Sequence, residues 1–159
     1  MNPPATLDHA GIAARVPHAG AMCLLARLQA WDAQQIECTA TNHRDAGHPL
    51  RTRSGLLAAC AIEYAAQAMA LHGALIAQQS GTEITPGWLA SARGVTLYRR
   101  RLDDLPLPAS PGAADALVIQ ATRQAGHAQH ILYEFTVSHA GVCLARGRAA
   151  VVLQPTLKP

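Results

Sequence analysis

The longest apolar stretch of this chain runs from Leu56 to Leu71 and is interrupted by one carboxylate and one amide, Glu63 and Gln67. The stretch is rich in Ala and Leu and contains no Pro, which predicts a helix. Because its residues are apolar almost all the way round, we expect the rest of the fold to enclose this helix. An ionised carboxylate in such surroundings loses hydration and needs a partner. Glu63 is therefore the residue that most constrains what the chain does.

The composition bounds the class of protein. The chain has 159 residues, half of them hydrophobic, which suits a single domain over residues 1–159 with a substantial core. The formal charge of +3 is mild, and the basic residues form only one short cluster without interleaved aromatic residues. We therefore expect no nucleic-acid partner.

The cysteines and the N-terminus indicate the compartment. The four cysteines lie far apart without a CxxC pair, and they are Cys23, Cys38, Cys60 and Cys143. They are expected to be buried free thiols in a reducing compartment. No secretory signal is visible, and the span 55–77, although apolar, contains Glu63, Gln67 and His72, which argue against a membrane span. We expect a soluble cytoplasmic protein.

The pattern along the chain predicts an α+β fold. Alternation and turn residues predict strands near 22–31, 34–42, 88–101, 115–124, 130–139 and 142–153, and the helix is expected at about 55–78. Ser54 is a plausible N-cap for the helix, and residues 139–141 form a short hairpin turn. In this order of elements, one antiparallel sheet must cover a single apolar helix.

Several short motifs occur in a fixed order along the chain. They are Pro17-His18 ahead of the first strand, His48-Pro49-Leu50 in the loop before the helix, Ile62-Glu63-Tyr64-Ala65-Ala66-Gln67 on the helix, and Gly87-Trp88-Leu89 leading to Arg93. In these motifs the chain resembles hotdog-fold 3-hydroxyacyl-(acyl-carrier-protein) dehydratases, over roughly residues 14–153. It looks closest to the dehydratase-like proteins of aryl-polyene and related polyketide-like lipid pathways.

The resemblance implies a fold and a reaction. The fold would be a curved antiparallel sheet wrapped around one long helix. The reaction would be dehydration of 3-hydroxyacyl thioesters on acyl carrier protein, or on coenzyme A, to trans-2-enoyl thioesters, with no metal or redox cofactor. His48 would be the base for the C2 proton and Glu63 the acid for the departing hydroxyl, with the two residues contributed by different subunits. A homodimer is expected, with a heterodimer with a paralogue as the alternative.

Three further residues are candidate supports for this site. Gln67 lies four residues after Glu63 on the same helix face, where it could hold the carboxylate or only satisfy itself in the core. For His18 a structural role is the favoured interpretation. Arg93 either lines the site or anchors a loop. The alternative for Glu63 itself is a structural pairing with an arginine, such as Arg93.

The chain departs from its relatives near the start of the helix. The better-known dehydratases have Gly-His-Phe-Pro-Gly in the loop and a Gly five residues before the helix Glu, where this chain has His48-Pro49-Leu50 and Ala58. Ala58 and Ala59 are expected to contact the substrate, because backbone N–H groups at a helix N-terminus can stabilise a thioester oxygen. These departures favour one alternative function, a non-catalytic acyl-binding subunit of a heterodimer. A hotdog acyl-thioesterase is the other.

The remaining polar clusters are weaker indications of a binding site. Arg99, Arg100 and Arg101 could steer an acidic carrier protein, or they could simply be the solvated end of a strand. His127 and His130 are three residues apart, which on one strand would place them on opposite faces, and no Cys or carboxylate completes a ligand set. No metal site is therefore predicted.

Overall fold

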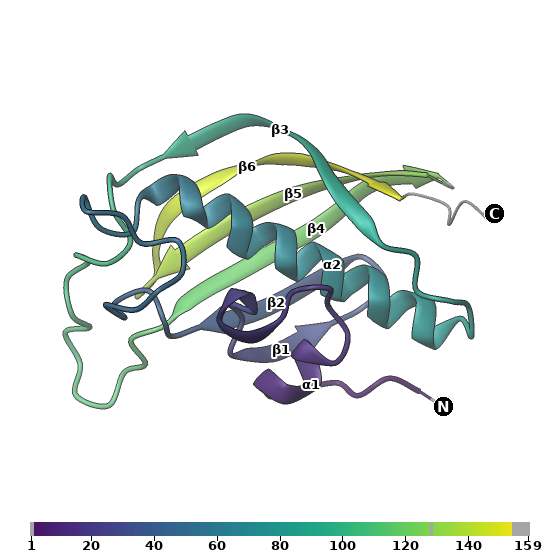
Figure 1. Ribbon diagram of the computed structural model, residues 1–159, viewed down its shortest axis with the longest axis horizontal. Coiled ribbons are helices and arrows are strands. Elements are labelled where there is room, and N and C mark those ends of the chain that lie inside the picture. Colours follow the sequence, from purple (N-terminus) through teal and green to yellow (C-terminus); the bar gives the residue numbers. More distant parts are fainter. Residues whose placement is uncertain (1, 128, 154–159) are drawn as a thin grey trace.

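A six-stranded antiparallel sheet curves around one long helix, α2 (Ala61–Gln79) (Figure 1). The computed structural model describes residues 2–127 and 129–153. The strands, in the spatial order β1-β2-β4-β5-β6-β3, are β1 (Arg27–Trp31), β2 (Gln35–Ala40), β4 (Leu117–His127), β5 (His130–His139), β6 (Val142–Leu153) and β3 (Gly87–Leu97). Short helices lie at α1 (His9–Ala13), η1 (Gly20–Met22) and η2 (Ala58–Cys60). The predicted α+β architecture is confirmed.

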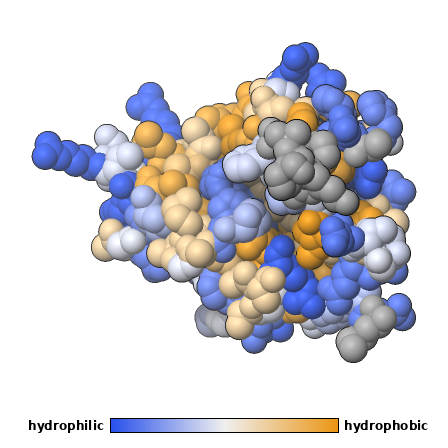
Figure 2. Space-filling model, turned by 45° about the vertical axis from the view of Figure 1, so that its right-hand side comes forward, coloured by the Kyte–Doolittle hydropathy of each residue, from blue (hydrophilic) through white to orange (hydrophobic). Residues whose placement is uncertain are grey.

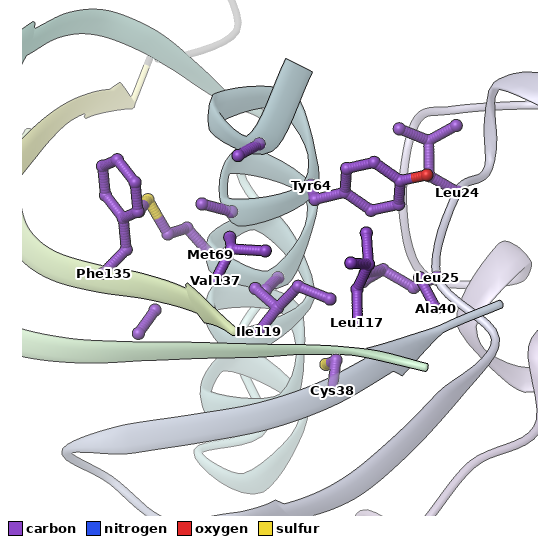
Figure 3. Close-up of a cluster of buried hydrophobic side chains, with 14 of the residues drawn as sticks. Leu24, Leu25, Cys38, Ala40, Tyr64, Met69, Leu117, Ile119, Phe135 and Val137 are labelled. Carbon is purple, nitrogen blue, oxygen red and sulfur yellow. The ribbon is translucent and has the colours of Figure 1, made fainter. Parts of the chain in front are cut away.

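The core lies between α2 and the concave face of the sheet. Along β5 the side chains of Ile131, Tyr133, Phe135 and Val137 are buried, and the residues between them are more exposed. This alternation is the period of two that a sheet with one buried face requires. Met69 of α2 lies beside Phe135 in the packed interior (Figure 3). Burial of one such side chain is worth about 1.5–3 kcal/mol, so the helix is held mainly by this face.

The long helix begins later than the sequence pattern predicts. The chain first forms the one-turn helix η2 and only then enters α2, and Ser54 caps neither of them. Instead, Thr52 and Gly55 exchange two backbone hydrogen bonds of 3.0 Å in a tight turn. Gly55 has a φ of +96°, and a Cβ at this position would lie 2.5 Å from the Arg101 Nε atom. The turn therefore needs glycine, and it ends before the helix can start.

The first strand is shorter than predicted, because the residues before it are bonded to the rest of the molecule. The strand was expected over residues 22–31, but β1 starts at Arg27. The Leu24 N–H donates to the Gln67 side chain at 2.8 Å, and the Leu25 carbonyl accepts from His9 Nδ1 at 2.8 Å. These contacts replace a strand ladder with bonds to α2 and α1.

The two edges of the sheet differ in how far they are covered. At the β1 edge, Leu7 and Leu28 exchange two backbone hydrogen bonds of 3.0 and 3.4 Å. Strand β3 is bonded to β6 on one side, and no other strand of the described residues pairs with it. Large apolar side chains are exposed on and next to β3, including Trp88 at 61% and Tyr98 at 51%. A long open edge of this kind is a surface that natural proteins usually cover.

Three sequence predictions concern the helix α2, the pair His127 and His130, and the cysteines. The segment Ala58–Gln79 is apolar and long enough to cross a membrane by composition alone, but half of its residues are buried within the fold. His127 and His130 lie directly opposite each other on β4 and β5, with ring centroids 6.0 Å apart. The prediction that they lie on opposite faces of one strand was wrong, because the chain reverses between them. The cysteines in the described residues are free thiols, two of them half-buried.

Candidate active site

Glu63 lies in the first turn of α2, where the partial positive charge of the helix N-terminus favours a carboxylate. Its Oε1 atom accepts a hydrogen bond from Gln67 Nε2 at 3.1 Å and lies 3.1 Å from His18 Nε2. About a third of the side chain is exposed, at 32%. Glu63 therefore combines fixed partners on one oxygen with access to the surface. The alternative pairing with Arg93 is not among the contacts of the described residues.

Gln67 connects α2 to the segment that precedes β1. Its side chain is fully buried and makes three hydrogen bonds. Its Oε1 accepts from the Leu24 N–H at 2.8 Å, and its Nε2 donates to the Met22 carbonyl at 2.7 Å and to Glu63 Oε1 at 3.1 Å. The amide thus bridges the carboxylate and the backbone of residues 22–24. The Gln67 amide therefore contacts both the carboxylate and the buried backbone.

His18 reaches Glu63 from the loop before η1. Its Nε2 faces the carboxylate, and 27% of the side chain is exposed. Its Nδ1 is buried and has no hydrogen-bond partner among the described residues. A carboxylate oxygen only accepts, so with a hydrogen on Nε2 the ring can donate to Glu63. Within one chain, the structure brings together Glu63, Gln67 and His18.

His48 lies in a different hydrogen-bond network of the same chain. The ring is buried, and its Nδ1 accepts from the Leu50 N–H at 3.0 Å, which leaves Nε2 to donate to the Tyr64 hydroxyl at 2.9 Å. Tyr64 in turn donates to Asn42 Oδ1 at 2.6 Å. Burial lowers the pKa of His48, which keeps the ring neutral. Both ring nitrogens are therefore engaged, and the structure of one chain does not bring His48 to Glu63.

The residues expected at the helix N-terminus contact the segment after β3. Ala58 is buried in η2, and its N–H donates to the Arg100 carbonyl at 3.0 Å. Ala59 is exposed. The Ala58 N–H is thus occupied by backbone in this structure, which leaves Ala59 as the accessible member of the pair.

The arginines of the sequence prediction occupy three different environments. Arg93 is exposed on β3, in register with Arg148 of β6. Arg99 and Arg100 are exposed, whereas Arg101 donates two hydrogen bonds, of 2.9 and 2.7 Å, to Asp103. Hydrogen bonding from Arg101 lowers the pKa of Asp103 to about 2. Within the described residues, Arg99 and Arg100 are the exposed members of the cluster without an ion-pair partner.

A charged cluster at the ends of β2, β4 and β5 was missed by the sequence analysis. Asp115 accepts from Arg44 at 2.6 and 3.1 Å, from His139 at 2.6 Å and from His43 at 3.3 Å. Hydrogen bonding from Arg44 is the main cause of the lowered pKa of Asp115. Nothing in the sequence signals the cluster, because its members are up to 96 residues apart in numbering, from His43 to His139.

This cluster is the one group in the described residues that could offer a metal ion three ligands, from His43, Asp115 and His139. Arg44 approaches both oxygens of the carboxylate, and a guanidinium in that position competes with a cation for the same lone pairs. The donor set therefore fits an electrostatic connection between strands better than a metal centre.

A hollow of about 330 Å³ lies further along α2, between the helix and the sheet. Its lining includes Met69, Gly73 and Ala77 from the helix and Tyr133 and Val151 from the sheet. The end of the molecule toward which α2 runs has apolar and polar side chains intermixed at its surface (Figure 2). Met69, the lining residue nearest to Glu63 in the sequence, is six residues after it, which along a helix is about 9 Å. The hollow is thus separate from the carboxylate along the helix axis.

The sheet wrapped around one helix, with a partly exposed carboxylate in the first helical turn, defines a hotdog-fold protein with a candidate acid–base site. Residues 10–158 match the ApeP-like family, described as ApeP dehydratase. The chain belongs to this ApeP-like dehydratase family. Among curated proteins it has no match.

Solved structures show the same fold. The chain is similar to a component of the dehydratase heterocomplex ApeI:P from Xenorhabdus doucetiae, with 21% identity, a TM-score of 0.77 and 91% of each chain covered. It is also similar to the PaaI protein from the phenylacetic acid degradation operon of E. coli, with 12% identity, a TM-score of 0.56, and 91% and 88% of the two chains covered. A hypothetical thioesterase protein of Streptococcus pneumoniae TIGR4, solved with coenzyme A, has 8% identity, a TM-score of 0.52, and 80% and 84% covered. The hotdog fold is thus confirmed.

Proposed function

We propose that this chain takes part in the dehydration of 3-hydroxyacyl thioesters carried by acyl carrier protein, giving trans-2-enoyl thioesters in an aryl-polyene or related lipid pathway. The observation that carries this proposal is the Glu63 carboxylate, held on one oxygen by Gln67 and His18 while its side chain reaches the surface. Membership of the ApeP-like dehydratase family supports the reaction class.

The reaction needs one group to accept a proton and another to supply one. A base removes the C2 proton, the C2–H electron pair forms the C2=C3 double bond, and the C3–O bond breaks. Glu63, as acid, protonates the departing hydroxyl so that water leaves. The base then returns its proton to Glu63, directly or through water, which restores the neutral base and the protonated Glu63.

The base is proposed to be His48, as the sequence resemblance implies, acting across a subunit interface. The open edge of β3 is the surface proposed for that interface, because pairing there would cover its exposed apolar side chains. Light scattering should give twice the 16.7 kDa mass of the chain. A Trp88→Lys, Leu97→Lys double variant should reduce this mass toward the monomer, and an unchanged dimer would contradict pairing through β3.

The function is tested with a 3-hydroxyacyl group on carrier protein, with loss of water followed by mass spectrometry. Glu63→Gln should lower kcat by about 10²–10⁴-fold, the usual contribution of one acid–base group. Glu134→Gln, the same chemical change on the exposed face of β5, serves as the control and should retain activity. Full activity of Glu63→Gln would rule the proposal out. Release of free thiol instead of enoyl product would identify a thioesterase.

One observation favours a second candidate function, a subunit that completes the site of a paralogue. Both ring nitrogens of His48 are bonded within their own chain, so using this ring as a base requires breaking at least one of these bonds. The similar structure from Xenorhabdus doucetiae is a heterocomplex. In this case the chain alone would be inactive, and a mixture of the chain with the paralogue would be active. Testing Glu63→Gln and His48→Asn in that mixture would then show which of the two residues this chain contributes to the site.

A further inference from the structure

The two oxygens of the Glu63 carboxylate have different environments. Oε1 accepts from Gln67 Nε2 at 3.1 Å and faces His18 Nε2 at 3.1 Å. Oε2 has no hydrogen-bond partner among the residues that the structure describes. We infer that His18 is a positioning residue of Glu63, which together with Gln67 reserves Oε1 as an acceptor and leaves Oε2 to exchange the proton with the substrate. This inference rests on the proposed dehydration.

The difference between the two oxygens determines which of them carries the proton of a protonated Glu63. With Gln67 donating to Oε1 and the His18 Nε2–H beside the same oxygen, the hydrogen of a protonated Glu63 is placed on Oε2. In the reaction, that hydrogen moves from Oε2 to the C3 hydroxyl, which leaves as water. The carboxylate that remains keeps the Gln67 hydrogen bond and the 3.1 Å contact with His18 on Oε1, and these stabilise the negative charge formed in this step.

The amide that holds Glu63 also anchors the segment that follows His18. Gln67 bonds the backbone at Met22 and Leu24, a few residues beyond His18, and its Nε2 also donates to the carboxylate. The three side chains are therefore fixed relative to one another by contacts within one chain, without a second subunit. Preorganised groups of this kind lower the barrier because they need no reorientation during the reaction.

His18 acts through Glu63 and not on the substrate. Its Nε2 lies 3.1 Å from Glu63 Oε1 and its Nδ1 is buried, which favours a role through the carboxylate. This arrangement separates it from His48, the proposed base. It also predicts which replacement can substitute for His18. Gln can place an amide N–H near the position of Nε2, whereas Leu fills similar space without a donor.

The kinetic test compares these two replacements with 3-hydroxyacyl carrier protein as substrate. His18→Leu should lower kcat by about 10–10²-fold with KM nearly unchanged, as expected when an interaction made in the transition state is lost. His18→Gln should recover most of this loss, and His130→Leu, at an exposed position on β5, should match the wild type. Unchanged kcat in His18→Leu, or an effect on KM alone, would overturn the inference.

A second test does not depend on activity. The unfolding free energies of His18→Leu, Glu63→Leu and the double variant form a double-mutant cycle in urea. The double variant should lose less stability than the sum of the single losses, because the two side chains share one contact. Additive losses would overturn the role of His18. If the cycle shows coupling between His18 and Glu63 but the wild-type chain has no dehydration activity, the proposed function is overturned and the contact between the two side chains stands.

Discussion

His48 and Tyr64 are joined by a 2.9 Å hydrogen bond from the imidazole Nε2 to the phenol oxygen. Tyr64, the residue after Glu63 on α2, thus bonds His48 of the preceding loop, whereas Glu63 itself lies beside His18. Neighbouring positions on one helix point in different directions, about 100° apart around the axis. The two histidines of the sequence prediction are therefore assigned to separate networks, one buried and one open to the surface.

The Tyr64 hydroxyl is expected to stabilise the loop that carries His48. Tyr64→Phe removes the group that accepts from His48 and donates to Asn42, and it leaves both without that partner. The free energy of unfolding should fall by about 1–3 kcal/mol, the cost of unpaired buried polar groups. Urea denaturation measures this change. Tyr98→Phe, at an exposed position, should change the free energy by less than about 0.5 kcal/mol, and equal losses in the two variants would contradict the role of Tyr64.

Gln67 should contribute more to stability than any exposed polar residue of α2. Gln67→Leu removes three hydrogen bonds and leaves the Leu24 N–H and the Met22 carbonyl unpaired. We expect a loss of about 2–4 kcal/mol in the free energy of unfolding, because each unpaired buried group costs about 1–3 kcal/mol. Gln79→Leu, in the exposed last turn of the same helix, is the matched control. A loss no larger than that of the control would show that the amide does not connect the two segments.

The buried histidines should make the fold sensitive to mild acid. Burial lowers the pKa of His43, His48 and His72, so in the folded state each binds a proton less readily than in the unfolded chain. As the pH falls below about 6.5 the unfolded state takes up more protons, and stability drops by up to about 1.4 kcal/mol per pH unit for each histidine. Below the folded-state pKa values the loss levels off.

Urea unfolding at pH 7.5, 6.5 and 5.5 measures this dependence, at pH values chosen around the ordinary histidine pKa of about 6.5. His130→Gln, at an exposed position, should leave the slope unchanged. An unfolding free energy that stays constant over this interval would contradict the prediction.

Two glycines should respond to alanine in opposite ways. Gly73 lies within α2, and a Cβ there would meet no atom within 4 Å, so Gly73→Ala should stabilise the protein by about 0.5–1 kcal/mol through helix propensity. Gly55 has a φ of +96°, and its Cβ would approach the Arg101 side chain to 2.5 Å, so Gly55→Ala should destabilise by about 1–3 kcal/mol. Thermal or urea unfolding of both variants tests the pair. A destabilising Gly73→Ala would mean that the hollow beside α2 is filled in solution.

The amino-acid sequence by itself determined the helix, the sheet and the identity of the central carboxylate. The apolar run around Glu63 and the alternation along residues 130–139 are local patterns, and their periods follow directly from helix and strand geometry. Gln67 could be placed beside Glu63 for the same reason, since a separation of four residues is one helical turn. The late start of α2 and the short β1 were not visible, because both depend on bonds to distant residues.

Only the tertiary structure decided which side chains meet. His18 reaches Glu63, His48 reaches Tyr64, and Asp115 joins His43 and His139, each across a separation that depends on the path of loops in space. A hydrogen bond needs its atoms within a few tenths of an ångström of the right distance, and sequence spacing across an irregular loop does not carry that precision. The sequence therefore determined that Glu63 needs a partner, and the fold determined that within one chain the imidazole facing it is that of His18.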